Sequence, residues 1–316
     1  MSKPNILQMG ALPEWDEAPM RDAYSLHRFF DAADQDALLS EVGPRIQAIA
    51  TRGDLGASDR IIAACPELEM IAVYGVGYDA VDIAACRARG IAVTNTPDVL
   101  TEDCADLALG MWLALSRGIV AAEAWARSGD WVRKGGFPLR HRAGGKCAGI
   151  LGLGRIGMAV AKRLEGFGMN IAYSARSARA GLDGWRYIPD AAELAAQSDV
   201  LFVTLSATAD TRHIVNSDVL AALGKEGMLV NISRAQNIDE EALLAALEQE
   251  KLRGAALDVF ENEPRLDPRF ARLDNVLLQP HHASGTHETR RAMGQMMRDN
   301  LSAHFAGRPL LSEVAT

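Results

Sequence analysis

Short apolar runs rich in β-branched residues alternate along the chain with Ala- and Leu-rich stretches whose apolar residues recur at helical spacing. This alternation is typical of parallel strands joined by crossover helices. We therefore predict an α/β protein with two parallel-sheet domains. The predicted strands are NILQM, YSLHRF, IQAIAT, MIAVYG and IAVTNT in the first domain, and CAGILG, NIAYSA, VLFVTL, MLVNIS, GAALDV and NVLLQP in the second.

Two turn-forming segments separate these groups of strands. They are NTPDVLT, which contains Pro97, and the Gly-rich RKGGFPLRHRAGGK. Proline and glycine interrupt regular elements, so either segment is a candidate boundary. We place the crossing into the second domain near residue 98.

Composition narrows the class of protein. The 316 residues are 48% hydrophobic and 23% charged, which is typical of a globular chain with a sizeable core. The start lacks the apolar core of a signal peptide, and the apolar stretch 107–115 is too short to cross a bilayer, so we expect a cytoplasmic protein without a membrane partner. The net charge of -8 argues against a nucleic-acid surface. Scattered cysteines predict neither disulfides nor a metal site: Cys65, Cys86, Cys104 and Cys147.

A glycine-rich turn follows the predicted strand at 148–151. Gly152, Gly154 and Gly157 form the pattern GxGxxG, and apolar residues then recur at helical spacing. Strand, glycines and helix together indicate the first turn of a dinucleotide-binding Rossmann unit, where backbone N–H groups approach a pyrophosphate. A merely tight turn is the alternative.

The end of the next predicted strand favours a phosphorylated cofactor. Where an acid usually accepts the ribose hydroxyls of NAD, this chain has Ala175, followed by Arg176 and Ser177. An arginine beside a hydroxyl suits the 2'-phosphate of NADP(H), which an acid would repel. We therefore predict NADP(H) as the preferred cofactor, with NAD(H) possible. The alternative is that Arg176 is a solvated surface residue.

Several longer motifs give the chain a family resemblance. GLGRIG, VNISRAQNIDEEAL, GAALDVFENEP and QPHHASGT, with YGVGYDAVD and TNTPDVLTEDCADLALG in the first domain, resemble the D-isomer-specific 2-hydroxyacid dehydrogenases in order and spacing. The resemblance covers nearly the whole chain. It implies two Rossmann/flavodoxin-like domains with an active-site cleft between them. Residues 1–98, completed by 286–316, would bind substrate, and residues 99–285 would bind NADP. Within the family, the chain looks most like the glyoxylate/hydroxypyruvate reductases.

Three residues after predicted strands have the chemistry that reduction of a 2-keto acid needs: a cation for the carboxylate and a proton donor for the carbonyl oxygen. The resemblance implies that Arg234 holds the carboxylate, that His281 is the general acid, and that Glu263 orients the imidazole and favours its charged form. His281 is preferred to His282 because the catalytic residue of the family follows proline. Ala235 departs from the glycine usual after the arginine.

The resemblance also implies further binding residues. Val76 and Gly77 match the loop whose backbone N–H groups bind the substrate carboxylate. Asp258 matches the acid that holds the nicotinamide amide, although a strand-end acid that bonds nearby amides is the alternative. The other cofactor-binding candidates implied are Thr101, Arg155, Ile156, Ser206, Thr211, Ile232, His281 and Ser284, several of them through backbone atoms.

The segment EDCADLALGMWLALSRGI is apolar around nearly its whole circumference, so as a helix it must be covered on several sides. The family uses this region to dimerise, which implies a homodimer, whereas a buried core helix is the alternative. Trp125 and Trp131 in the next segment could contact a partner or pack locally.

The expected activity is NADPH-dependent reduction of a small 2-keto acid, glyoxylate or hydroxypyruvate, to the D-2-hydroxy acid. One alternative is a reductase of a bulkier acid, 2-ketogluconate or hydroxyphenylpyruvate. A second, of a different class, is a dinucleotide-sensing corepressor-like protein with vestigial turnover.

Overall fold

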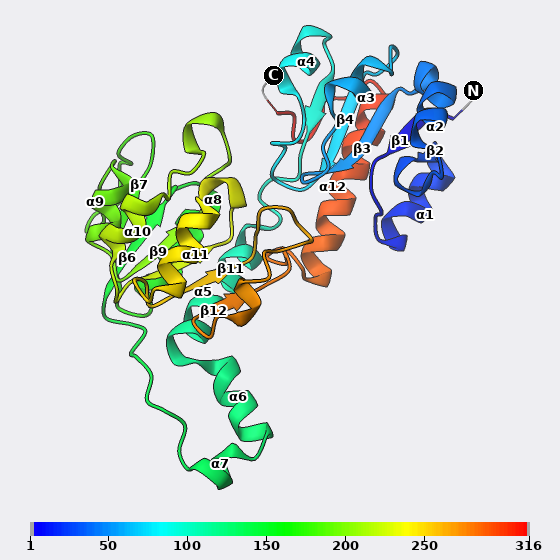
Figure 1. Ribbon diagram of the computed structural model, residues 1–316. Helices are drawn as coiled ribbons and strands as arrows, with labels where there is room; N and C mark the ends of the chain where they lie inside the picture. Colours follow the sequence, from blue (N-terminus) through cyan, green and yellow to red (C-terminus); the bar gives the residue numbers. More distant parts are fainter. Residues whose placement is uncertain (1–2, 315–316) are drawn as a thin grey trace. The chain divides into compact units, whose positions relative to one another are not determined.

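The computed structural model describes residues 3–314 and divides into two units (Figure 1). The first comprises Met1–Leu100 and Ser284–Thr316, and the second comprises Thr101–Ala283. The first segment of the first unit thus ends at residue 100, where the sequence analysis expected residue 98. Its second segment begins at residue 284, where the sequence analysis expected residue 286. Each unit has its own parallel sheet, as predicted.

The first unit has a five-stranded sheet in the order β2-β1-β3-β4-β5, in which all neighbours are parallel. This is the flavodoxin-like order, and the central strands β3 and β4 are almost completely buried. The strands are β1 (Asn5–Gln8), β2 (Ser25–Arg28), β3 (Ala48–Arg52), β4 (Met70–Tyr74) and β5 (Ala92–Thr94); the α-helices are α1 (Glu14–Ala23), α2 (Gln35–Val42), α3 (Asp59–Ala63), α4 (Ile83–Ala88) and α12 (His287–Phe305).

The C-terminal segment completes this first unit. Helix α12 packs against β4 and α1, and the Tyr74 hydroxyl donates to the Arg290 carbonyl at 2.7 Å. The chain then returns to the edge strand, where the Val314 N–H donates to the Val93 carbonyl at 2.8 Å. Residues from both ends of the sequence therefore build one core.

The second unit has a seven-stranded parallel sheet in the order β12-β11-β10-β9-β6-β7-β8. It contains the six strands predicted there and a two-residue strand, β8, that was not predicted. The strands are β6 (Cys147–Leu151), β7 (Asn170–Ser174), β8 (Arg186–Tyr187), β9 (Val200–Val203), β10 (Met228–Asn231), β11 (Gly254–Leu257) and β12 (Val276–Leu278); the α-helices are α5 (Thr101–Arg117), α6 (Ile119–Arg127), α7 (Asp130–Lys134), α8 (Arg155–Glu165), α9 (Ala191–Ala196), α10 (Ser217–Leu223) and α11 (Glu240–Glu248).

The strand order of the second unit places its candidate site. The chain starts the sheet at β6, builds outward through β7 and β8, and then crosses to β9 on the other side of β6. Ligands of open α/β sheets bind outside the carboxyl ends of the strands at such a switch point. The glycine turn after β6 therefore lies where a dinucleotide is expected.

Helix α5 is covered on several sides, as its composition predicts. Cys104, Ala108, Met111 and Trp112 are buried, whereas Glu102, Asp106 and Gly110 form an exposed stripe. The Arg163 guanidinium of α8 spans two residues of this stripe, with 2.6 Å bonds to the carboxylates of Glu102 and Asp106. The helix is thus a core element of the second unit.

Helices α6 and α7 and the segment after them project from the rest of the second unit (Figure 1). We call residues 119–140 the arm. Neither helix has a buried residue. Trp125 packs locally, since its Nε1–H donates to the Gly135 carbonyl at 3.1 Å and its ring lies 5.8 Å from that of Phe137. Trp131 is instead 67% exposed.

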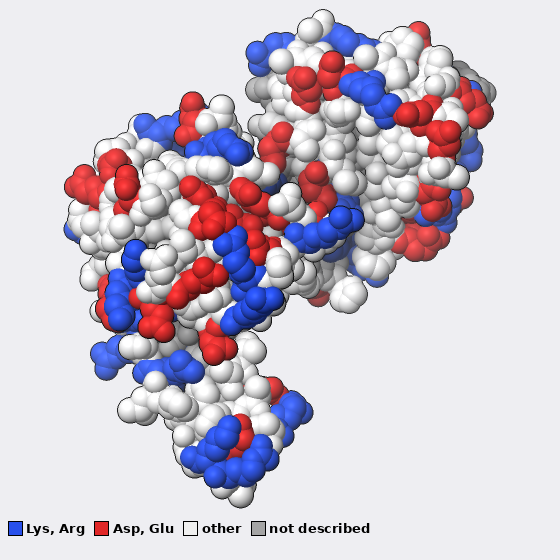
Figure 2. All heavy atoms as spheres, viewed as in Figure 1, with Lys and Arg blue, Asp and Glu red and all other residues white. Residues whose placement is uncertain are grey.

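Charges of both signs are interspersed over the drawn face, and basic side chains gather where α7 lies (Figure 2). Arg133 and Lys134 of α7 are both paired with Asp130, at 2.5 and 3.1 Å. Within residues 3–314, no single helix is long and apolar enough to cross a membrane. Helices α5 and α6 reach this length and composition only when taken together, and they are bent by 61° where they join.

Candidate active site

The glycine turn after β6 has the geometry that a dinucleotide requires. Gly152 has a φ of +103°, and a Cβ there would lie 2.8 Å from the Leu205 nitrogen. A Cβ on Gly157 would lie 2.2 Å from the Gly152 carbonyl oxygen, so this glycine lets α8 approach the strand. At Gly154 a Cβ would meet nothing within 4 Å, which leaves open space beside the helix N-terminus. Among residues 3–314 no side chain caps α8, so its first N–H groups suit a pyrophosphate.

The predicted phosphate-recognition residues lie next to this turn. The Ser174 carbonyl at the end of β7 accepts from the N–H groups of Gly152 and Leu153, at 3.0 and 3.2 Å. Arg176 and Ser177 follow after Ala175 and are exposed. The loop that carries them is therefore fixed beside the glycine turn at its first residue.

A second arginine in this loop escaped the sequence analysis. Nη2 of Arg179 lies 3.5 Å from the Leu153 carbonyl of the glycine turn. The loop is held by two tyrosine hydroxyls: Tyr173 accepts from the Arg179 N–H at 2.9 Å, and Tyr187 donates to the Ala175 carbonyl at 3.2 Å. The repeated arginine in SARSAR was the available signal, but its position depends on how the loop folds back.

The carboxyl ends of β10, β11 and β12 bring the predicted catalytic segments side by side. The Asp258 N–H donates to the Asn231 carbonyl at 2.9 Å, and the His281 N–H donates to the Asp258 carbonyl at 2.8 Å. Arg234 follows β10 by three residues, so it leaves the sheet next to the strand that leads to Asp258. Distant parts of the sequence thus meet at the carboxyl ends of these strands.

His281 and Glu263 form the pair that the sequence analysis expected. Nδ1 of His281 lies 2.7 Å from Oε2 of Glu263, and Oε1 of Glu263 accepts from the Phe260 N–H at 2.9 Å. Both side chains are partly exposed, at 39% and 29%. Because Nδ1 is engaged, Nε2 is the nitrogen left for a substrate. His281 has a φ of +52°, a strained conformation for a non-glycine residue that is common at functional sites.

Arg234 extends from a turn shaped by a buried asparagine. Oδ1 of Asn231 accepts from the Ser233 N–H and hydroxyl at 2.9 and 2.8 Å, and its Nδ2 donates to the Arg234 carbonyl at 3.2 Å. Nη1 of Arg234 donates to the Ser233 carbonyl at 2.8 Å. The guanidinium is therefore oriented by its own turn. Asn231 was not singled out from sequence, because a strand-end asparagine has no distinctive pattern.

The contacts of Asp258 are those of a strand-end acid that bonds nearby amides, which was the alternative to a nicotinamide contact. Its buried carboxylate accepts from the N–H groups of His282 and Ala283, at 2.6 and 2.9 Å. Burial raises the pKa of this carboxyl, and the two accepted hydrogen bonds oppose that effect. Asp258 thus shapes the segment that follows His281, and a contact with nicotinamide stays a prediction.

The remaining candidates are distributed over both units. In the second unit, Thr101 begins α5, Ile232 is buried after β10, and the Thr211 hydroxyl donates to the Ser206 carbonyl at 2.9 Å. Arg155 and Ile156 form the first turn of α8. Val76, Gly77 and Ser284 belong to the first unit. Val76 follows β4, and its carbonyl accepts from the Asn95 amide at 2.8 Å.

Comparison with known families identifies the class of the second unit. Residues 109–283 match the model described as D-isomer specific 2-hydroxyacid dehydrogenase, NAD binding domain. The chain belongs to the D-isomer specific 2-hydroxyacid dehydrogenases. The resemblance stated from the sequence motifs is thereby confirmed.

Curated members of this dehydrogenase family match almost end to end. The chain is 42% identical to glyoxylate/hydroxypyruvate reductase A HPR2 of Arabidopsis thaliana, over 99% of this chain and 100% of the relative. It is 41% identical to hydroxyphenylpyruvate reductase of Plectranthus scutellarioides, over 98% of each. It is also 39% identical to 2-ketogluconate reductase of Gluconobacter oxydans, over 99% of each.

Solved structures of dehydrogenases have the same architecture. A 2-hydroxyacid dehydrogenase from Ketogulonicigenium vulgare Y25 is 63% identical, with a TM-score of 0.93 and coverage of 100% of this chain and 99% of that one. An NADPH-dependent glyoxylate/hydroxypyruvate reductase from Sinorhizobium meliloti, in complex with NADP and malonate, is 43% identical. Its TM-score is also 0.93, with coverage of 99% of this chain and 97% of that one. The predicted fold class is therefore confirmed.

Proposed function

We propose that this dehydrogenase uses NADPH to reduce a small 2-keto acid to the D-2-hydroxy acid, with glyoxylate and hydroxypyruvate as first candidates. The observation that carries the proposal is the 2.7 Å distance between Nδ1 of His281 and Oε2 of Glu263. This pair lies at the carboxyl ends of the strands, where Arg234 also leaves the sheet. The named activities of the Arabidopsis and Sinorhizobium relatives support these substrates and this cofactor.

Each residue has a distinct role in the proposed reaction. Arg234 binds the carboxylate of the 2-keto acid, and its guanidinium polarises the adjacent carbonyl. His281 donates the proton on Nε2 to the carbonyl oxygen, while Glu263 stabilises the imidazolium through Nδ1. Bound NADPH supplies the hydride that C2 accepts. We assign Val76 and Gly77 of the first unit to the substrate carboxylate.

A panel of 2-keto acids tests this proposal. Oxidation of NADPH is followed at steady state with glyoxylate, hydroxypyruvate, 2-ketogluconate and hydroxyphenylpyruvate. We expect the highest kcat/KM with one of the two small acids. Preference for 2-ketogluconate or hydroxyphenylpyruvate would favour the activities named for the Gluconobacter and Plectranthus relatives. Tight NADPH binding without turnover of any acid would instead favour a corepressor-like sensing role.

We further propose that Arg176 selects NADPH through the 2'-phosphate. Arg176→Ala should weaken NADPH binding by about tenfold to a hundredfold, because one charge-assisted contact contributes roughly 1.5 to 3 kcal/mol. NADH, which lacks the phosphate, should bind almost unchanged. Combining Arg176→Ala with Ala175→Asp should turn the preference toward NADH, since a carboxylate repels phosphate and accepts ribose hydroxyls.

Fluorescence titration of each variant with both cofactors measures this selectivity. Lys162→Ala is the matched control, because Lys162 is an exposed cation in the last turn of α8. Equal losses for NADPH and NADH in Arg176→Ala, or a wild-type protein that prefers NADH, would leave Arg176 as a solvated strand-end residue.

We also propose that the protein is a homodimer in which the arm contacts a second copy. The support is the exposure of its apolar side chains, with Val132 at 92%, Trp131 at 67% and Val120 at 60%. Light scattering after size exclusion should give about twice the 34.0 kDa chain mass. Val132→Asp should shift this mass toward the monomer, whereas a monomeric wild type would refute the proposal.

Cytoplasmic location and the lack of nucleic-acid and membrane partners stay predictions from composition.

A further inference from the structure

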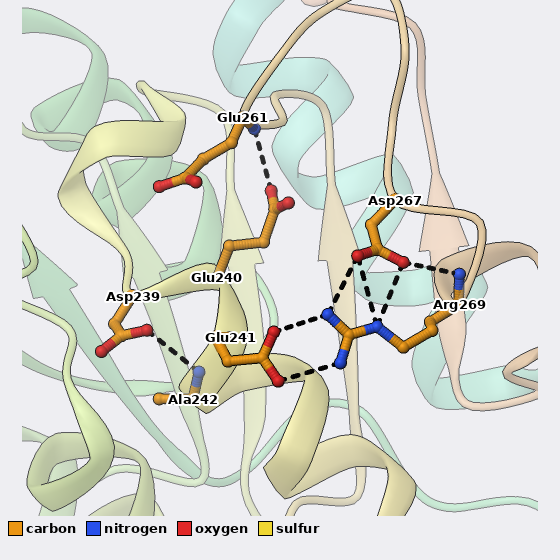
Figure 3. A network of polar contacts seen from close by, with 7 residues as sticks. All are labelled: Asp239, Glu240, Glu241, Ala242, Glu261, Asp267 and Arg269. Atoms are coloured by element: carbon orange, nitrogen blue, oxygen red, sulfur yellow. Dashed lines mark hydrogen bonds and ion pairs between the residues drawn. The ribbon is translucent and has the colours of Figure 1, made fainter.

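Two neighbouring carboxylates at the start of α11 contact the loop that carries Glu263. This loop, residues 258–270, follows β11 and ends in a short 3-10 helix at Phe270–Arg272. Oε2 of Glu240, the first residue of α11, accepts from the Glu261 N–H at 2.9 Å (Figure 3). Glu240 therefore holds the backbone two residues before Glu263.

Glu241 holds the other limb of the same loop. The Arg269 guanidinium forms a fork with Glu241, at 2.9 and 2.5 Å, and also bonds to Asp267 within the loop (Figure 3). These carboxylates raise the pKa of Arg269, and the guanidinium lowers the pKa of Glu241 and of Asp267. One helical turn thus fixes the loop on both sides of Glu263.

Between these two anchors the loop is exposed. Residues 262–266 are all on the surface, and Glu263 lies among them. Within the loop, the Glu263 carboxylate is held by the Phe260 N–H, next to Glu261. A small shift of Glu261 would therefore move both the backbone and the carboxylate partner of Glu263.

Glu240 itself is half-buried, which distinguishes its contact from a simple surface bond. Burial raises the pKa of its carboxyl, the accepted Glu261 N–H lowers it, and the nearby Glu261 and Asp267 raise it again. The Arg269 guanidinium lowers this pKa as well. The bond between Glu240 and the Glu261 amide is therefore partly shielded from water.

The position of α11 also links this loop to the Arg234 segment. The residues after Arg234 form a short 3-10 helix at Ala235–Asn237, and Asp239 then caps α11 by accepting from the Ala242 N–H at 3.0 Å (Figure 3). Glu240 follows this cap directly. The turn that ends the Arg234 segment thus also anchors the Glu263 loop.

We propose that Glu240 is a positioning residue of the active site, whose carboxylate oxygen holds the Glu261 amide and so keeps Glu263 in place against His281. This inference rests on the proposed function, in which His281 donates the proton. Glu240 touches no reacting atom in this scheme. It acts through the loop backbone and the Glu263 carboxylate.

Substitutions at Glu240 separate an acceptor role from a charge role. Glu240→Ala removes the acceptor and should lower kcat about tenfold, because a misplaced catalytic group loses much of its effect. The KM for NADPH should not change, whereas the solvent deuterium isotope effect on kcat should rise because proton donation limits turnover more strongly. Glu240→Gln keeps an oxygen acceptor at the same reach and should stay within about twofold of wild type.

Further variants make the result decisive. Glu240→Asp keeps the charge but is one methylene shorter, so it should fall with Glu240→Ala and replaces that variant if alanine prevents folding. Glu248→Ala is the matched control, an exposed acid at the other end of α11 with no expected effect. His281→Gln tests the proposed function in the same series, because retained turnover there would refute His281 as proton donor whatever Glu240 does.

Three results would overturn the inference while His281 stays essential. The first is an unchanged kcat in Glu240→Ala and Glu240→Asp. The second is an equal fall in Glu240→Gln and Glu240→Ala, which would indicate charge and not an acceptor. The third is a fall in kcat without a rise in the isotope effect, which would indicate a general structural defect.

Discussion

We expect His281→Ala to lower kcat by a factor of hundreds or more while NADPH binding stays nearly unchanged. General acid catalysis contributes roughly 10² to 10⁴ in rate, and alanine has no proton to donate. In the structure, Nδ1 of His281 is engaged by Glu263 at 2.7 Å, so the imidazole presents Nε2 for this transfer. Steady-state kinetics and cofactor titration of the same preparation measure the two effects separately.

The adjacent histidine is the matched control for this experiment. His282 is exposed, and its N–H bonds to the Asp258 carboxylate in either variant because that contact uses backbone. His282→Ala should therefore change kcat by much less than His281→Ala. A reversed order of the two effects would show that the proton donor had been assigned to the wrong histidine.

Elements with strong local patterns could be predicted from sequence. Eleven strands were expected and all eleven are present, because most of them are apolar runs that are buried in a parallel sheet. Strands β2 and β12 are only partly buried. Strand β8 was missed, since Arg186 and Tyr187 have no such pattern and the strand only extends the sheet edge beside β7. The glycine turn was predictable because close approach at Gly157 admits no side chain.

Contacts between distant segments could be predicted only in part. Family resemblance implied that Glu263 orients the His281 imidazole, and the position of both residues after predicted strands was compatible with their meeting. Nothing in the sequence indicated that Glu240 bonds to the Glu261 amide, because such a bond depends on the path of the loop after β11. The contact of Arg179 with the glycine turn depends in the same way on a loop held by Tyr173 and Tyr187.

Asp258 shows how one residue type fits two roles. Its position at the end of β11 was compatible with a cofactor contact or with bonding to nearby amides. The structure has the second kind of contact, to His282 and Ala283. Residue type could not distinguish these roles, because a carboxylate accepts several hydrogen bonds and both sets of donors lie at the same strand end.

Arg234→Lys is expected to lower kcat/KM for the 2-keto acid on the order of a hundredfold, or roughly 2.7 kcal/mol at 1.36 kcal/mol per factor of ten. Nη1 of Arg234 already bonds to the Ser233 carbonyl at 2.8 Å, in a turn fixed by Asn231. A guanidinium can keep this bond and still present other N–H groups to a carboxylate, whereas an ammonium has no planar fork. The loss should thus appear in substrate use and not in NADPH binding.

Kinetics with varied 2-keto acid at saturating NADPH measure this loss, and titration with NADPH checks that the cofactor site is intact. Arg272→Lys is a suitable control, because Arg272 is an exposed arginine of the 3-10 helix before β12 and has no place in the proposed site. It should leave kcat/KM unchanged. A near-normal KM in Arg234→Lys would remove Arg234 from the substrate site, since the carboxylate would then be bound equally well without the forked contact.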